Sequence, residues 1–430
     1  MEKKLCRKEF AKYVILNVLG MIGLSCYILA DTFFVANGLG ADGLTALNLA
    51  IPVYSLVHGS GLMFGVGGAT RYSILRGQKR QKNADEIVTN TVLFAMVTAV
   101  IYMMCGIFVS GKITLLLGAD DSVFTMTNTY IRVILLFAPA FMLNDVFLCF
   151  VRNDGNPGLA MAAMLTGSFS NILLDYIFIF VLKMGIFGAV LATGVAPVIS
   201  MLVLSFHGKR KERFHLIPTK LSALLCGKCM VLGIPSLITE VASGIVMIVF
   251  NLIILRLEGN IGVAAYGVVA NISLVVVSIY TGVAQGMQPL VSRAYGDGDT
   301  KRIKRFLRYA MVTMLTLSVV IYAYIFANAD FIAKIFNSEN NLNLQKMVET
   351  GLKMYFSSVA FIGFNVILSM YFSATEKPVP AQIISLLRGF ILMIPMAFLL
   401  SNVTGLTGVW LTVTVTEAMV AVVGALLYSK

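Results

Sequence analysis

Ionisable side chains occur inside long apolar stretches of this chain, where they could bind ions or move protons. They are Asp31, Asp145, Asp175, Glu240, Arg388 and Glu417, with His58 as a further candidate. An ionised side chain near the middle of a bilayer costs at least about 2.5 to 3.5 kcal/mol. Each of these groups therefore needs a partner, a polar cavity or a function.

Asp31 and Asp175 are the strongest candidates for ion coupling. They are expected on different helices of the first half, and Asn171 lies one turn before Asp175 on the same helical face. Two buried carboxyl groups close together cannot both stay ionised cheaply, so such a pair can take up and release a proton. The same oxygen atoms could instead bind sodium, a hard cation that favours carboxylate and carbonyl oxygen.

The other charged groups allow more than one interpretation. Glu240 could neutralise a cationic substrate in a central cleft, or it could pair with Arg388. Arg388 and Glu417 are expected near the middle of adjacent spans, which favours a structural ion pair. His58 could change charge near neutral pH, although a lone histidine between small residues is more often a packing residue. Asp145 is expected near the end of its helix, where it would satisfy polar groups. The candidate substrate-binding residues are Glu240, Arg388, Glu417 and His58.

The composition is typical of an integral membrane protein. Of the 430 residues, 58% are hydrophobic and 13% are charged, and the mean hydropathy is +0.87. A soluble core could not hide so much apolar surface, whereas a bilayer takes about 20 apolar residues per spanning helix. The net charge of +12 does not indicate nucleic-acid binding, because the basic residues flank apolar segments in alternate loops.

Cys226 and Cys229 form a lone CxxC pair, which is weak support for zinc, and no metal site is expected.

Apolar runs between basic or Gly/Pro breaks predict twelve spans and an all-α polytopic fold. They lie near residues 12–36, 46–74, 88–110, 128–151, 158–182, 185–207, 228–256, 262–292, 307–329, 350–373, 379–401 and 405–428. Most of the 33 lysines and arginines fall on the side of the two termini, which predicts cytoplasmic termini in a cell membrane.

The chain also repeats itself at an offset of 219 to 221 residues. Gly40 and Gly259 begin similar segments, as do Gly185 and Gly405. Because the offset spans six helices, the two halves should enter the membrane in the same orientation, with a substrate site between them. The predicted division is an N-terminal lobe at 1–208, a cytoplasmic connector at 209–228 and a C-terminal lobe at 229–430.

Several segments together resemble the multidrug and toxic compound extrusion (MATE) family of the MOP superfamily, nearly end to end. Residues 30–40 read ADTFFVANGLG, 171–180 read NILLDYIFIF, 185–193 read GIFGAVLAT and 286–296 read GMQPLVSRAYG. Residues 151–157, VRNDGNP, look like the bacterial branch that includes MepA and the DNA-damage-inducible F proteins. The resemblance implies a cation site in the first half that also includes a tyrosine and a threonine, which match Tyr130 and Thr193. Another branch places an acid in the tenth span, and residues 364–372 contain none.

The leading hypothesis is a secondary antiporter that exports organic, cationic and amphipathic compounds in exchange for protons or sodium. The alternative is a lipid-intermediate flippase or a specific metabolite exporter of the same superfamily. No GxxxxGK[ST] element is present, so ATP is not expected to drive transport directly. A membrane enzyme is not expected, because the three histidines, His58, His207 and His215, are widely separated. We expect a monomer with no cofactor whose partners are a small organic molecule and the lipid bilayer.

Overall fold

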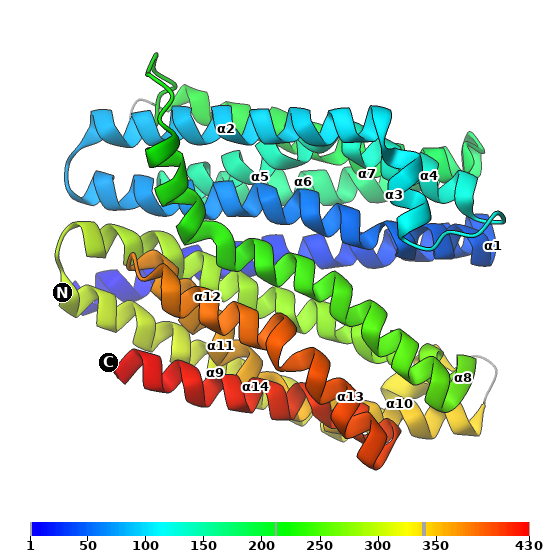
Figure 1. The fold of residues 1–430 in the computed structure, drawn as a ribbon. Coiled ribbons are helices and arrows are strands. Elements are labelled where there is room, and N and C mark those ends of the chain that lie inside the picture. The colour runs from blue at the N-terminus through cyan, green and yellow to red at the C-terminus, as the bar shows by residue number, and fades with distance from the viewer. Residues whose placement is uncertain (1, 211–212, 338–340, 430) are drawn as a thin grey trace.

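The computed structural model describes residues 2–210, 213–337 and 341–429, and in these ranges the chain is helical with short connections (Figure 1). The first half contains α1 (Glu2–Gly77), α2 (Gln81–Phe108), α3 (Ser110–Leu116), α4 (Phe124–Leu136), α5 (Ala138–Asn153), α6 (Pro157–Tyr176), the π-helix η1 (Ile177–Val181), α7 (Gly185–Leu204) and the 3₁₀ turn η2 (Ser205–Lys209). The second half contains α8 (Ala223–Gly296), α9 (Thr300–Phe336), α10 (Leu342–Tyr355), η3 (Phe356–Ser358), α11 (Val359–Ala374), α12 (Pro378–Leu386), the π-helix η4 (Leu387–Ile391), α13 (Met393–Thr404) and α14 (Leu406–Ser429).

The helices account for the twelve predicted spans. Among the described residues, nine helices are long and apolar enough to cross a membrane, or ten when α4 and α5, which meet at a 49° bend, count as one span. Two of the ten, α1 and α8, are each divided by a glycine with positive φ, Gly40 at 69° and Gly259 at 62°. Only glycine adopts this conformation without a Cβ clash. The all-α polytopic fold class is thus confirmed.

The sequence repeat is visible in the backbone. The paired glycines Gly40 and Gly259 break α1 and α8 with nearly the same dihedral angles. Gly185 and Gly405 also share a positive φ, at 63° and 62°. The bend at Phe137 between α4 and α5 has its counterpart in η3, which begins at Phe356. Irregular points of the backbone therefore recur at the offset of the sequence repeat.

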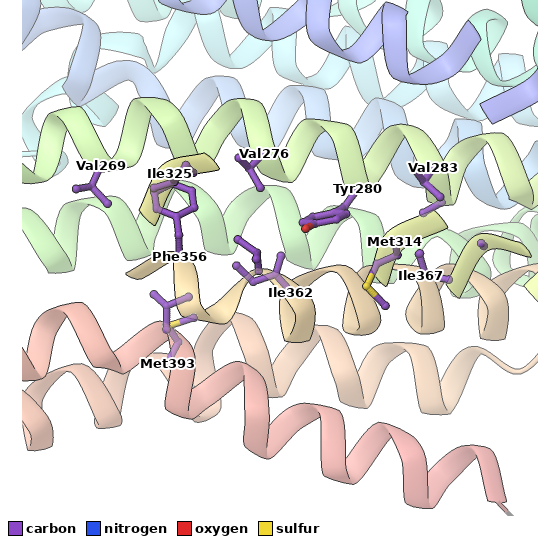
Figure 2. Packing of buried hydrophobic residues seen from close by; sticks show 14 of the residues in the cluster. Val269, Val276, Tyr280, Val283, Met314, Ile325, Phe356, Ile362, Ile367 and Met393 are labelled. Carbon is purple, nitrogen blue, oxygen red and sulfur yellow. The ribbon is translucent and has the colours of Figure 1, made fainter. Parts of the chain in front are cut away.

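Two bundles lie side by side, α1 to α7 above and α8 to α14 below in Figure 1. The second bundle has its own apolar core, in which α8, α9, η3 and α11 pack together (Figure 2). Val276 and Tyr280 of α8 face Ile362 of α11 there, and Met314 of α9 lies beside Tyr280. A separate cluster fills the first bundle. The division at 1–208, 209–228 and 229–430 remains a prediction about domains, and residues 211 and 212 of the predicted connector lie outside the described residues.

The bundles contact each other closely near the end that carries both termini, and the helices diverge toward the opposite end (Figure 1). A Cβ added at Gly67 of α1 would lie 1.9 Å from the carbonyl oxygen of Cys229 of α8. One added at Gly233 of α8 would lie 1.9 Å from the carbonyl oxygen of Met63. Only glycine permits so close an approach of two backbones.

Each half also places its first turns in the core of the other. Cys6, Phe10 and Val14 of α1 pack in the cluster of the second bundle. Cys226 and Cys229 at the start of α8 pack in the cluster of the first. Both cysteines are free thiols in this apolar setting, and no group of three metal-ligating side chains occurs within the described ranges. The CxxC pair therefore lies where the two bundles meet.

Polar side chains complete this contact at the terminal end. Arg152 donates to Asn17 Oδ1 at 2.9 Å and to Gln285 Oε1 of α8 at 2.6 Å. Arg71 of α1 forms an ion pair with Glu376, which lies between α11 and α12. The terminal end is thus closed by backbone contact, hydrogen bonds and an ion pair between the bundles.

The predicted connector is held along the first bundle rather than free of it. Asp154 accepts hydrogen bonds from the Tyr72 hydroxyl at 2.6 Å and from the backbone N–H of Phe214 at 2.9 Å, and its Oδ2 lies 2.8 Å from His207 Nε2. Burial would raise the pKa of Asp154, but these hydrogen bonds and the nearby Arg76 guanidinium together lower it below its usual value. Asp154 therefore acts as an ionised anchor for the connector.

Candidate coupling and substrate site

The structure brings Asp31 and Asp175 together. Asp31 is in the first segment of α1, and Asp175 is in the last turn of α6. Both are buried, and their carboxyl groups are within hydrogen-bonding reach of each other. Asp31 Oδ1 and Asp175 Oδ1 have no hydrogen-bond partner in the part of the chain that the structure describes. Two carboxyl groups with free oxygen atoms can share a proton or ligate a small cation.

The other three residues predicted for this site surround Asp175. With its amide oriented to suit its neighbours, Asn171 donates to Asp175 Oδ2 at 2.9 Å and accepts from the backbone N–H of Thr193 at 3.2 Å. Tyr130 of α4 lies within hydrogen-bonding reach of the Thr193 side chain. Helices α1, α4, α6 and α7 therefore all contribute a polar group to one buried cluster.

A local backbone feature follows Asp175 directly. The α-helix α6 ends at Tyr176 and continues as the π-helix Ile177–Val181. Such wider turns loosen the regular hydrogen bonding and are frequent at functional sites. Its apolar sequence, IFIFV, carries no signal that distinguishes it from an α-helical turn, so sequence reasoning missed it.

His58 and Asp145 form a pair that the sequence did not predict. His58 Nδ1 lies 2.9 Å from Asp145 Oδ2, with side-chain exposures of 16% and 7%. The expected position of Asp145 near the end of its helix is wrong, because it lies within the interior of α5, one turn and more from either end. The carboxylate that His58 needs thus comes from a neighbouring helix, and single-helix reasoning could not find it.

Glu240 lies beside this pair and not beside Arg388. A Cβ added at Gly59 of α1, next to His58, would be 3.0 Å from Glu240 Cβ of α8. Glu240 is half-buried, and the charged groups that it faces are His58 and Asp145. The prediction that Glu240 could pair with Arg388 is wrong. His58, Asp145 and Glu240 instead place three titratable groups where the two bundles meet.

Arg388 and Glu417 pair with each other in the second bundle. Arg388 donates from Nε and Nη2 to Glu417 Oε1 at 3.1 and 2.8 Å. Asn365 of α11 donates to Glu417 Oε2 at 2.7 Å. The side chains of Arg388 and Glu417 are 12% and 3% exposed. This geometry is the structural ion pair that the sequence favoured, and it separates Arg388 and Glu417 from the Glu240 and His58 candidates.

Two tyrosines lie between the acid pair and His58. The Tyr27 hydroxyl, one turn before Asp31 on α1, is 3.1 Å from the Tyr54 hydroxyl. The Tyr54 ring stacks on the His58 ring with a centroid separation of 5.7 Å and an interplanar angle of 13°. Sequence reasoning missed both tyrosines, although the position of Tyr27 four residues before Asp31 was an available signal.

The repeat, the apolar helices and the buried polar clusters define a polytopic α-helical membrane protein, and the match to a known family identifies its class as a transporter rather than an enzyme. The MatE family model matches residues 18–177 and 235–399, so the chain belongs to the MATE family.

Curated relatives and solved structures match this chain over nearly its full length. A multidrug export protein, MepA of Staphylococcus saprophyticus, is 25% identical over 99% of this chain and 94% of its own length. A MOP superfamily transporter from Pyrococcus furiosus, whose structure is described as having a binding pocket of reverse polarity, superposes with a TM-score of 0.91 at 23% identity, covering 98% and 95% of the two chains. The outward-facing conformation of a MATE multidrug resistance transporter gives the same TM-score, identity and coverage.

Proposed function

We propose that this protein exports organic, cationic and amphipathic compounds in exchange for protons or sodium, by alternating access between its two halves. The observation that carries the proposal is the buried Asp31–Asp175 pair with one unpartnered oxygen on each carboxyl group. A static channel or scaffold gains nothing from two adjacent buried acids, which each cost free energy in a membrane. A coupled transporter needs such a pair.

The coupling ion would bind at Asp31 and Asp175. Asn171 fixes the Asp175 carboxyl group by hydrogen bonding, and Thr193 and Tyr130 close the other side of the cluster. Gain or loss of positive charge here changes which hydrogen bonds are favourable between α1 and α6. Asp175 lies two residues before the π-helix Ile177–Val181, where such a change could alter helix packing at low cost.

The substrate would bind nearer the contact between the bundles. Glu240 is half-buried there and belongs to α8, whereas the coupling pair belongs to the first half. Its carboxylate favours a cationic group over an anionic one. The match to multidrug export proteins supports organic, drug-like compounds as the exported molecules.

The arrangement of the bundles supports alternating access. They are closed at the terminal end and diverge at the opposite end (Figure 1). With both termini cytoplasmic, as the distribution of basic residues favours, this conformation would face outward. Inward opening would require the Arg71–Glu376 and Arg152–Gln285 contacts to separate.

Proteoliposomes with separately imposed proton and sodium gradients test the proposal. We expect uptake of a fluorescent organic cation against its gradient with one ion and not the other. Asp31→Asn and Asp175→Asn should each lower driven transport by about 100-fold, while the exposed Asp42→Asn should leave it unchanged. Transport indifferent to both gradients, or unaffected by loss of both acids, would disprove the mechanism. Movement of an anionic lipid intermediate in the absence of cation export would instead favour the flippase alternative.

A further inference from the structure

The His58–Asp145 pair lies beside Glu240 where the two bundles meet, and the proposed function does not use it. His58 belongs to the second segment of α1, Asp145 to α5 and Glu240 to α8. The groups that face His58 are Asp145 and Glu240 from the neighbouring helices, and Tyr54 from α1 itself. Tyr102 of α2 lies close by but bonds to the Ser60 hydroxyl at 2.9 Å.

The charges of this group do not balance unless another cation or proton is present. Protonated His58 neutralises one carboxylate, and its short contact assigns that one to Asp145. Glu240 is then left with a net negative charge in a half-buried position. A buried carboxylate of this kind must hold either a proton or an external cation.

We propose that His58 is a positioning residue that determines substrate charge specificity: held by Asp145, its imidazolium keeps the neighbouring Glu240 carboxylate ionised and able to accept an organic cation. This inference rests on the proposed function, because it takes Glu240 as the substrate contact. The charge balances in both states of Glu240: the ionised carboxylate accepts the organic cation directly, and at low pH, where Glu240 is protonated, its proton leaves to water as the cation binds.

The orientation of His58 is fixed from two sides, as a positioning role requires. On one side, Asp145 Oδ2 lies 2.9 Å from His58 Nδ1 in an ion-pair contact, and on the other the stacked Tyr54 ring fixes the plane of the imidazole. The Tyr54 hydroxyl contacts Tyr27, which is one turn from Asp31. Tyr27, Tyr54 and His58 therefore form a row of neighbouring side chains that begins one turn from Asp31 and ends beside the helix segment that approaches Glu240.

Equilibrium binding of tetraphenylphosphonium to the purified full chain across pH 5 to 9 tests this inference. In the wild type, affinity should rise with pH as Glu240 loses its proton. His58→Gln removes the adjacent positive charge, so the midpoint of that rise should move upward by about one pH unit and affinity near neutral pH should fall about tenfold. His58→Lys retains a positive charge and should restore most of the shift.

Two controls distinguish this role from a structural one. Ser60→Ala removes a neighbouring hydrogen bond on the same helix and should leave the pH profile unchanged. Binding of an uncharged dye, Nile red, should be the same in His58→Gln as in the wild type. Equal losses of tetraphenylphosphonium and Nile red binding in His58→Gln would mean a packing role and would overturn the inference.

Glu240→Gln separates this inference from the proposed function. If Glu240→Gln weakens cation binding but His58→Gln leaves its affinity and pH profile unchanged, the positioning role is wrong and the proposed function stands. If Glu240→Gln itself has no effect, the substrate contact is wrong and the inference fails with it. Gradient-driven transport by the wild type is unaffected by either result, so failure of coupling is detected independently.

Discussion

The first half of the chain buries two carboxyl groups beside each other, whereas the second half buries a carboxylate beside an arginine. Asp31 and Asp175 leave two oxygen atoms without partners among the described residues. Glu417 receives two hydrogen bonds from Arg388 and one from Asn365 at its carboxylate. The two halves therefore differ in how their buried carboxylates are partnered: within the described ranges the first half leaves oxygen atoms free, and the second matches its carboxylate with a guanidinium.

On the proposed function, this contrast assigns the response to an ion gradient to the first half. A guanidinium stays charged at all physiological pH values, so the Arg388–Glu417 pair has no proton to exchange. The acid pair can gain or lose positive charge without moving a side chain far. At the repeat offset, Asp31 corresponds to Asn251, and Asp175 to Pro395 or Met396, so the second half has no equivalent acids.

The largest effect on stability should come from removing one charge of the buried Arg388–Glu417 ion pair in the second half. Glu417→Gln keeps the size of the side chain but leaves the Arg388 charge buried without its carboxylate. Breaking a buried ion pair in this way costs about 3 to 5 kcal/mol, measurable as a lower free energy of unfolding or midpoint temperature in detergent.

The double variant Arg388→Met/Glu417→Leu is the matched control for that prediction. It removes both charges and keeps similar volume, so it should recover most of the lost stability. If Glu417→Gln is as stable as the wild type, the pair is not a structural element and the comparison between the halves fails.

An intermediate effect is expected at Asp154, an acid of the first half that is fully partnered outside the membrane. Asp154→Asn replaces an acceptor of three donors by an amide, so it should cost about 1 to 3 kcal/mol at neutral pH. Because the pKa of Asp154 is lowered in the folded chain, its contribution is present above the usual aspartate value and is lost as pH falls through the folded value.

Measured below about pH 5, the difference in stability between wild type and Asp154→Asn should thus shrink as the pH falls past about 4. Asp121→Asn, in an exposed loop, supplies the control for loss of one negative charge. A difference that grows as the pH falls would contradict the assignment of Asp154 as an ionised anchor. The expected result would show that Asp31 and Asp175 differ from Asp154, another buried acid, in having carboxyl oxygen atoms without hydrogen-bond partners among the described residues, and not in burial alone.

Much of the fold and part of the site could be predicted from the sequence. Apolar runs of spanning length and the paired glycines Gly40 and Gly259 indicated where helices begin, break and repeat. The approach of Asp31 to Asp175 followed from the resemblance and from the cost of lone acids in a bilayer. The pairing of Arg388 with Glu417 followed from the expected positions of both residues near the middle of adjacent spans.

The site contacts that could not be predicted from the sequence depend on how the helices are rotated and aligned against each other. A membrane helix has no reliable polar face to reveal that rotation, since lipid and protein interior are both apolar. The sequence therefore gave no indication that Asp145 faces His58, or that Glu240 approaches Gly59 across the bundle contact. The hydroxyl contact of Tyr27 with Tyr54 depends on the same rotations.

The smallest effect on stability should come from Asp31→Asn, although the same variant should abolish coupling. Asp31 Oδ1 has no partner to lose within the described chain, and an amide beside Asp175 replaces a costly pair of acids by a neutral donor. We expect a change in unfolding free energy within about 1 kcal/mol, measured in the same detergent and at the same pH as Glu417→Gln. A loss as large as that of Glu417→Gln would mean that Asp31 is as firmly paired as Glu417. The acid pair would then be structural, and the first half would have no advantage over the second in sensing an ion.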